Sequence, residues 1–164
     1  MPGSAQITIR PAKSSESGLV RAFIAELAEY ERLSHEVRVT EVDVAAALFG
    51  PDPRAFCDIA EVKGEPIGFA LWYYSFSTFE GRAGVWLEDL YVRPNWRGAG
   101  VGKALLAGLA RRCVAENLAR LEWAVLDWNE PAIAFYDALG ATAETGWTDR
   151  RLSGPALASL AGSA

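Results

Sequence analysis

The segment Arg97-Gly98-Ala99-Gly100-Val101-Gly102 is the most informative local signal for the fold of this chain. It follows an apolar run, Val85 to Val92, which is typical of a buried strand, and it precedes apolar residues that recur at helical spacing from Val101 to Cys113. Glycines between a strand and a helix let the backbone turn tightly and approach a ligand. The start of a helix adds unpaired N–H groups and the positive end of the helix dipole. The stretch therefore predicts a strand, a loop and a helix that together bind a phosphate group.

Two common phosphate-binding motifs can be tested against the register of this loop. An ATP-binding P-loop needs a glycine where this chain has Arg97, and a serine or threonine where it has Ala104. A dinucleotide-binding loop that began at Gly98 would need its last glycine where the chain has Lys103. Both motifs are excluded. The pattern that does fit is Arg/Gln-x-x-Gly-x-Gly/Ala, beginning at Arg97.

Two adjacent acidic residues, Glu88 and Asp89, interrupt the apolar run that leads into the loop. A strand in the middle of a mixed sheet is apolar on both faces, and an unpaired buried carboxylate is costly. Adjacent residues on a strand point to opposite faces unless a β-bulge intervenes. Asp89 is a candidate for a structural carboxylate that binds backbone or an arginine. A positioned carboxylate can instead act as a general base, and both interpretations stay open at this point.

A further acidic residue, Glu31, prolongs the apolar stripe of a helix predicted over residues 19–33. It follows Leu27 by one helical turn, whereas Glu29 lies on the opposite side of the helix. An acid in this position is either at a frayed helix end or faces a cleft.

Composition and charge restrict the class of protein. The chain has 164 residues, of which 51% are hydrophobic, and we expect one globular domain over residues 5–161. A net charge of −5 argues against nucleic acid as a partner and is compatible with a cationic one, although ordinary solubility explains it equally well.

The chain has few residues that bind metals or form disulfides. Its cysteines, Cys57 and Cys113, are too few for a disulfide framework, and neither they nor His35 have metal-ligand spacing. We therefore expect no metal, no catalysis based on histidine or cysteine, and a reducing cytoplasmic location. The N-terminus has no signal pattern and no apolar run approaches the length of a membrane span, so no membrane partner is expected.

The rest of the chain predicts a mixed α/β domain with the element order β-α-α-β-β-β-α-β-α-β. Thr40 is suited to cap a helix that ends at Gly50, and the turn at Gly64–Glu65 predicts a β-hairpin. The strands are expected over residues 7–10, 56–63, 67–76, 85–92 and 121–128, with two more short strands after Gly140 and a terminal helical segment over 156–160.

A second informative segment begins at Asn129. Asn129 suits the N-cap of a helix over residues 130–139, Glu130 its positive first turn and Pro131 its first positions. Gly140 stands where a left-handed C-terminal cap belongs. By itself the segment is compatible with nothing more than a well-made helix start.

Together the two segments resemble the acetyl-CoA-binding motifs of the GNAT superfamily of N-acetyltransferases, in the correct order. The first is the loop from Arg97 to Gly102, and the second is Asn129-x-Pro-Ala-x-x-Phe-Tyr-x-x-x-Gly-Ala. The resemblance implies acetyl-CoA as co-substrate and a central, mixed but mainly antiparallel sheet flanked by helices.

Further stretches are similar to the diamine (spermidine/spermine) and thialysine acetyltransferase branch of that superfamily. They are Glu26-Leu-Ala-x-Tyr-Glu, Gly68-Phe-Ala-x-Trp-Tyr-Tyr and Trp86-Leu-Glu-Asp-Leu-Tyr-Val, so that the similarity runs from the first helix to about Trp147. Two departures stand out. The segment between Ala141 and Gly146 is shorter than in the diamine enzymes, and Thr145 replaces an acid of their polyamine sites. These departures favour thialysine-like amino acids or other small amines over spermidine itself.

The resemblance also implies roles for particular residues. Tyr136 would be the general acid for the departing thiolate, and Glu88 would act near the attacking nitrogen. Tyr30, Glu31 and Glu88 would bind the substrate. The residues that would bind the cofactor are Leu90, Tyr91 and Val92 through their backbone, Arg97, Gly98, Ala99, Gly100, Val101, Gly102 and Lys103 around the pyrophosphate, and Asn129 and Tyr136.

The expected function is transfer of an acetyl group to the primary amine of a small cationic molecule, such as a diamine, a polyamine or a thialysine-like amino acid. The amine would attack directly within a ternary complex, and the family resemblance implies a homodimer. One alternative is an acetyltransferase for a protein lysine or N-terminus. Another is a CoA-binding sensor without turnover, against which the presence of Glu88, Asn129 and Tyr136 argues.

Overall fold

The computed structural model describes residues 6–163. The chain forms two compact units, the first ending at Ala124 and the second beginning at Val125.

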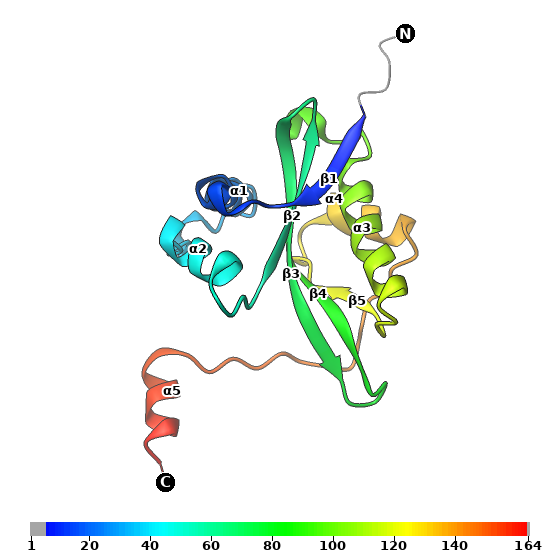
Figure 1. Cartoon of the computed structure of the whole chain (residues 1–164). Coiled ribbons are helices and arrows are strands. Elements are labelled where there is room, and N and C mark those ends of the chain that lie inside the picture. The colour runs from blue at the N-terminus through cyan, green and yellow to red at the C-terminus, as the bar shows by residue number, and fades with distance from the viewer. Residues whose placement is uncertain (1–5, 164) are drawn as a thin grey trace. The chain divides into compact units, whose positions relative to one another are not determined.

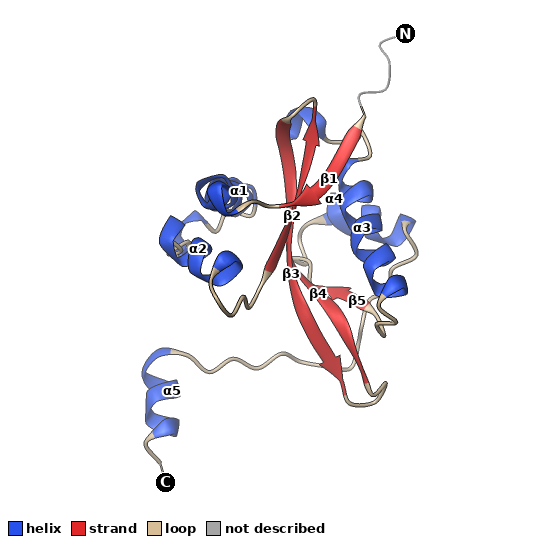
Figure 2. Cartoon of the chain, viewed as in Figure 1, coloured by secondary structure: helices blue, strands red, loops and turns tan. Residues whose placement is uncertain are grey.

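A five-stranded sheet forms the centre of the first unit (Figure 2). Its strands follow one another in chain order, and each of the first three is antiparallel to the next. The last pair, β4 with β5, is parallel, which requires the crossover that α3 provides. The prediction of a mixed, mainly antiparallel sheet is confirmed. The strands are β1 (Ile7–Pro11), β2 (Phe56–Val62), β3 (Glu65–Ser77), β4 (Arg82–Val92) and β5 (Leu121–Trp123).

Helices cover both faces of this sheet (Figure 1). On one side lie α1 (Ser17–Tyr30) and α2 (Glu41–Phe49), and on the other lies α3 (Val101–Ala115). On the α1 side, the Phe23 ring stacks on that of Phe69 with centroids 5.3 Å apart. Burial of an aromatic or aliphatic side chain of this kind contributes about 1.5–3 kcal/mol to the free energy of unfolding. This apolar layer therefore fixes α1 against the sheet.

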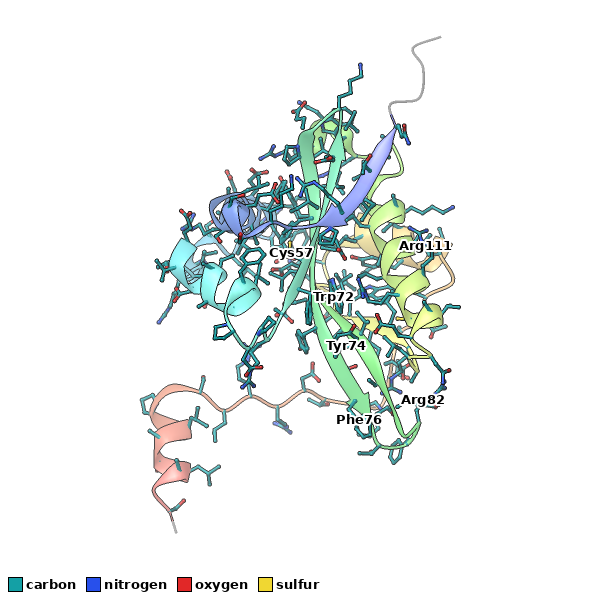
Figure 3. All side chains as sticks on the ribbon, viewed as in Figure 1. Cys57, Trp72, Tyr74, Phe76, Arg82 and Arg111 are labelled. Carbon is teal, nitrogen blue, oxygen red and sulfur yellow. The ribbon has the colours of Figure 1, made fainter. Side chains whose placement is uncertain are left out.

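Side chains of α3 and of Glu116, the residue after it, contact β3 at Trp72 and Tyr74, which are labelled in Figure 3. The Arg112 guanidinium lies over the Trp72 ring, 4.8 Å from its centroid, and the Trp72 indole donates to Asp58 Oδ2 at 3.1 Å. The Tyr74 hydroxyl donates to Glu116 at 2.7 Å. Arg112 of α3 thus packs on an aromatic side chain of β3.

The predicted helix cap at Thr40 and the predicted turn at Gly64 are confirmed. Thr40 caps α2 by accepting from the Asp43 N–H at 3.2 Å, while Asp43 accepts from the Thr40 N–H at 2.8 Å. The predicted β2–β3 hairpin forms around Lys63 and Gly64, whose φ angles of 50° and 81° are typical of a type I′ turn.

The second unit contains α4 (Glu130–Ala138) and α5 (Gly154–Ala161). Gly140, with φ of 85°, has the expected left-handed conformation. Two expectations were wrong. The strand predicted over 121–128 ends at Trp123, because pairing with β4 extends only from Val85 to Leu87. The two short strands expected after Gly140 are also absent, because the described residues 141–153 contain no strand and the sheet consists of β1 to β5 alone.

Candidate active site

The loop between β4 and α3 has a backbone that only glycine adopts easily. Gly98 has φ of 76°, and Gly100, the N-cap of α3, has φ of 85°. A side chain in this left-handed region costs about 1–2 kcal/mol. A Cβ atom at either position would meet no atom within 4 Å, so the backbone here is open to a ligand.

The start of α3 directs hydrogen-bond donors toward this open space. The first amide bonded within the helix is that of Ala104, which donates to the Gly100 carbonyl at 2.9 Å. The N–H groups of Val101, Gly102 and Lys103 therefore precede the helical hydrogen-bond ladder, and Gly100, the N-cap residue, has no side chain to cap them. Helix N-termini of this kind bind phosphate groups, and Lys103 adds a positive charge. These donors fit the diphosphate of a CoA-type cofactor.

The strand that leads into the loop has one edge without a strand partner. Among the described residues, β5 pairs with β4 only at Val85–Leu87. The Arg93 N–H donates to the Ile67 carbonyl of β3 at 2.9 Å. Because backbone groups alternate between the two edges of a strand, those of Leu90 and Val92 point to the edge away from β3. An extended ligand chain could pair with them there, whereas Tyr91 directs its backbone groups toward β3.

Arg97, a predicted cofactor-binding residue, directs its side chain toward the end of α1. Its Nε donates to the Val92 carbonyl at 2.9 Å. Its guanidinium carbon lies 4.6 Å from the ring centroid of Tyr30 and 5.5 Å from that of Tyr91. The loop and the predicted substrate-binding residue Tyr30 are thus in contact through one side chain.

A β-bulge in β4 explains the two adjacent acids. Asp89 is opposite Leu71 and Leu87 is opposite Trp72, so Glu88 has no partner on β3. A bulge interrupts the alternation of side chains, which lets neighbouring residues approach the same side of the sheet. The exposed Glu88 carboxylate accepts a hydrogen bond from the indole N–H of Trp86 at 3.0 Å.

Asp89 is the acidic residue for which the sequence left two roles open. Burial raises the pKa of its carboxyl group to about 7, and the charges of Glu88 and Glu31 add to the increase. Among residues 6–163, no arginine or backbone N–H donates to this carboxyl group, so the structural role proposed for it finds no support. The available signal was the pair of adjacent acids, which share one side only if a bulge forms.

Glu31 completes a group of three carboxylates. It is the C-cap of α1, and burial raises the pKa of its carboxyl group. The helix ends at Tyr30 rather than at the predicted Leu33. Arg32, with φ of 61°, reverses the chain in a Schellman motif, in which its N–H donates to the Glu29 carbonyl at 3.1 Å. Glu31 is partly buried while the Glu29 side chain is exposed, as the helical spacing predicted.

In the second unit, the predicted helix start at Asn129 is confirmed. Its side-chain oxygen accepts from the Ala132 N–H at 3.4 Å, and the residue is buried with 6% of its surface exposed. Tyr136 lies on α4, half-buried, with its ring 5.3 Å from that of Phe135. Within this unit, α4 therefore carries both residues that the second motif singled out.

Other residue types with catalytic potential lie away from this group. Cys57 and Cys113 are buried free thiols whose pKa values burial raises, which makes them poor nucleophiles. The His35 side chain is exposed on the connection between α1 and α2. Over residues 6–163, no three His, Cys, Asp or Glu side chains gather as metal ligands do. The helices in that range are too short or too polar to cross a membrane.

The open strand edge, the glycine loop and the helix N-terminus beside an acidic group define an acyl-CoA-dependent N-acyltransferase. The profile of the acetyltransferase (GNAT) family matches residues 20–141, and the chain belongs to this family, whose members use acetyl-CoA. The resemblance that the two motifs predicted is thereby confirmed at the level of the family.

Relatives of known name match nearly the whole chain. A thialysine N-epsilon-acetyltransferase from Bos taurus is 40% identical over 167 residues, which cover 95% of this chain and 98% of that protein. The human spermidine/spermine N(1)-acetyltransferase-like protein 1 is 29% identical over 149 residues, covering 85% of this chain and 21% of that protein. Among solved structures, an integron cassette protein from the mobile metagenome of V. cholerae has a TM-score of 0.79 and 25% identity, covering 96% of this chain and 98% of that one.

Proposed function

We propose that this enzyme acetylates the terminal primary amine of a small cationic molecule, with thialysine-like amino acids and diamines as the first candidates. The observation that carries the proposal is the group formed by Glu31, Glu88 and Asp89, whose charges act on one another beside the open edge of β4. Carboxylates in a partly buried setting attract an ammonium group strongly. The names of the relatives with similarity over the full chain support a substrate of this kind.

Acetyl-CoA supplies the acetyl group as an activated thioester. In the proposal, the N–H groups at the start of α3 and the side chain of Lys103 bind the diphosphate, with Gly98, Ala99, Gly100, Val101 and Gly102 forming the loop around it. The backbone groups of Leu90 and Val92 align the extended part of the cofactor along β4, and Tyr91 and Arg97 support that edge. Asn129 and Tyr136 are proposed to approach the cofactor from α4.

Two residues of this chain are proposed to assist proton transfers during the reaction. A free alkylammonium group has a pKa near 10.4, so a base must take up a proton before the nitrogen can attack. Glu88, directly or through water, is proposed as that base. The nitrogen then bonds to the acetyl carbonyl carbon, the carbon–sulfur bond breaks, and Tyr136 donates a proton to the sulfur. The second proton that the nitrogen loses on becoming an amide passes to water, and Tyr136 regains a proton from water. Holding both reactants in place contributes most of the rate, and proton transfer adds roughly 10²–10⁴-fold.

Several wider properties are proposed with this function. Residues 5–161 are proposed to act as one catalytic domain in the cytoplasm, without a metal and without nucleic acid or membrane as a partner. We also propose a homodimer. Exposed apolar side chains of the second unit support it, since Trp147, Leu152, Leu157 and Leu160 are 77%, 46%, 52% and 63% exposed.

A panel of amines tests the proposal. The protein is incubated with acetyl-CoA and, in turn, thialysine, lysine, ornithine, putrescine, spermidine and a lysine-containing peptide, and the release of free thiol is followed. Turnover that is fastest with one of the small amines is the expected result. The strongest turnover with the peptide would instead favour a protein acetyltransferase. CoA binding without turnover of any amine would favour a sensor.

A further inference from the structure

Two arginines connect the segment after β4 to successive turns of α1. Arg93 forms an ion pair with Glu26 at 2.9 Å, and its guanidinium lies over the Phe23 ring. Arg97 lies over the Tyr30 ring, one helical turn beyond Glu26. The second connection differs from the first because it starts inside the glycine loop and ends on the last residue of the helix.

The Arg97 side chain is also anchored at its base. Its Nε donates to the Val92 carbonyl, the last backbone acceptor of β4, at 2.9 Å, while the guanidinium carbon lies over the rings of Tyr30 and Tyr91. A guanidinium stacks well on an aromatic face, whereas an ammonium group lacks the flat surface for such a contact. Lys103, the other cation beside the predicted diphosphate site, lies in the first turn of α3.

We infer that Arg97 is a positioning residue: by stacking on Tyr30 it holds the diphosphate loop in its binding conformation and connects that loop to the amine-binding end of α1. The inference rests on the proposed function for the identity of the ligands. Gly98 and Gly100 give the loop many backbone conformations, and a fixed Arg97 restricts them. A preorganised loop pays less ordering entropy when the cofactor binds. Because such coupling is reciprocal, cofactor binding in turn orders Tyr30 and Glu31 for the amine.

Calorimetric titration of CoA into purified variants tests this inference without any amine. Tyr30→Leu removes the ring from a residue outside the loop and is expected to weaken CoA binding about two- to five-fold, the range for an exposed cation–π contact. Tyr30→Phe keeps the ring and should retain the affinity. Arg97→Lys keeps the charge but loses the stack, so Tyr30→Leu should have no further effect in an Arg97→Lys background.

Lys103→Gln provides the matched control. It removes a positive charge from the same loop, so it should weaken CoA binding, and its effect should multiply with that of Tyr30→Leu because Lys103 does not act through the ring. Unchanged CoA affinity in Tyr30→Leu would overturn the inference. So would independent, multiplying effects of Tyr30→Leu and Arg97→Lys. Far-UV circular dichroism verifies that each variant is folded.

The result of the CoA titration does not depend on the result of the amine panel that tests the proposed function. The CoA titration contains no amine, so an inactive amine panel would refute the substrate proposal and leave the Arg97–Tyr30 coupling to stand or fall by the titration. For any amine that is turned over, Arg97→Lys should raise the KM for that amine as well, whereas Lys103→Gln should raise only the KM for acetyl-CoA.

Discussion

Asp89 belongs to the acidic group of the proposed site, and its ionised form lowers the free energy of unfolding. Burial and the neighbouring carboxylates raise its pKa from the ordinary 3.8 to about 7. Between about pH 4 and pH 7, Asp89 is therefore protonated in the folded protein and ionised in the unfolded chain. Stability that is fully present below pH 4 is lost as the pH rises through 7. Because each pKa unit corresponds to about 1.4 kcal/mol, ionised Asp89 costs up to about 4 kcal/mol.

Asp89→Asn should therefore be more stable than the parent at pH 8, by up to about 4 kcal/mol, and the difference should shrink toward pH 4. Urea unfolding curves at pH 4.5, 6 and 8 measure it. Glu29→Gln, which alters an exposed carboxylate on the same helix as Glu31, should change stability little at any of these pH values. A constant difference between Asp89→Asn and the parent across the series would contradict a buried, pH-sensitive carboxyl group.

The proposed role of Tyr136 depends on one atom, its hydroxyl oxygen. Tyr136→Phe removes the hydroxyl group that is proposed to donate a proton to sulfur, so kcat should fall about 10²-fold or more. The affinity for CoA should change little, because the ring remains on α4. Steady-state kinetics and CoA titration separate the two quantities. Equal loss of both, or an unchanged kcat, would remove Tyr136 from the role of general acid.

At the scale of the elements, predictions from sequence succeeded where the cause is local. The Thr40 cap and the Gly100 turn depend on a few neighbouring residues. The strand over 121–128 and the strands after Gly140 were wrong because a strand exists only where a partner pairs with it, and alternating residues do not specify that partner.

In the candidate site, too, the sequence predicted only those features that have a local cause. The glycine loop, the cap at Asn129 and the inward side of Glu31 followed from spacing. The bulge at Glu88 and the pKa of Asp89 did not, because both arise from packing between distant parts of the chain. The contact of Arg97 with Tyr30 likewise joins residues far apart in sequence, so no local pattern indicates it.

A substitution at Gly100 tests whether the loop between β4 and α3 binds the diphosphate. Gly100→Ala forces a side chain into a left-handed conformation, which should cost about 1–2 kcal/mol or change the loop. The KM for acetyl-CoA is expected to rise at least tenfold. Gly108→Ala is the matched control, since Gly108 lies inside α3 and its Cβ would meet Ile9 at an ordinary 3.7 Å. That variant should keep its activity and gain about 0.5–1 kcal/mol. Equal kinetics in both variants would argue against the loop as the diphosphate site.

At the scale of the whole molecule, the chain leaves several large apolar side chains in water. Among the described residues they occur near the end of the chain, at Leu152, Leu157 and Leu160, and also at the tip of the β3–β4 hairpin, where Phe79 is 91% exposed. Exposed apolar side chains that gather within one segment are typical of an interaction surface. The segment around α5 is therefore the first candidate for contact between two copies of the chain.

A double variant tests the proposed homodimer. Light scattering during size-exclusion chromatography should give the parent a mass twice that of one chain. Leu157→Glu with Leu160→Glu places charges on the exposed side of α5 and should shift the mass to that of one chain. Phe79→Ser, which changes the hairpin tip, should leave the larger mass unchanged. A parent that elutes as a single chain at micromolar concentration would refute the proposal.

The bulge at Glu88 has a consequence for how such enzymes can diverge. On β3, Leu71 and Trp72 are neighbours, and their partners on β4 are Asp89 and Leu87. Loss of Glu88 would bring those partners together and leave every other pair of the ladder as it is. The proposed base thus occupies a bulge position outside the paired residues of the ladder. We expect that the gain or loss of one codon at this point adds or removes the proposed base while the paired residues of both strands keep their register.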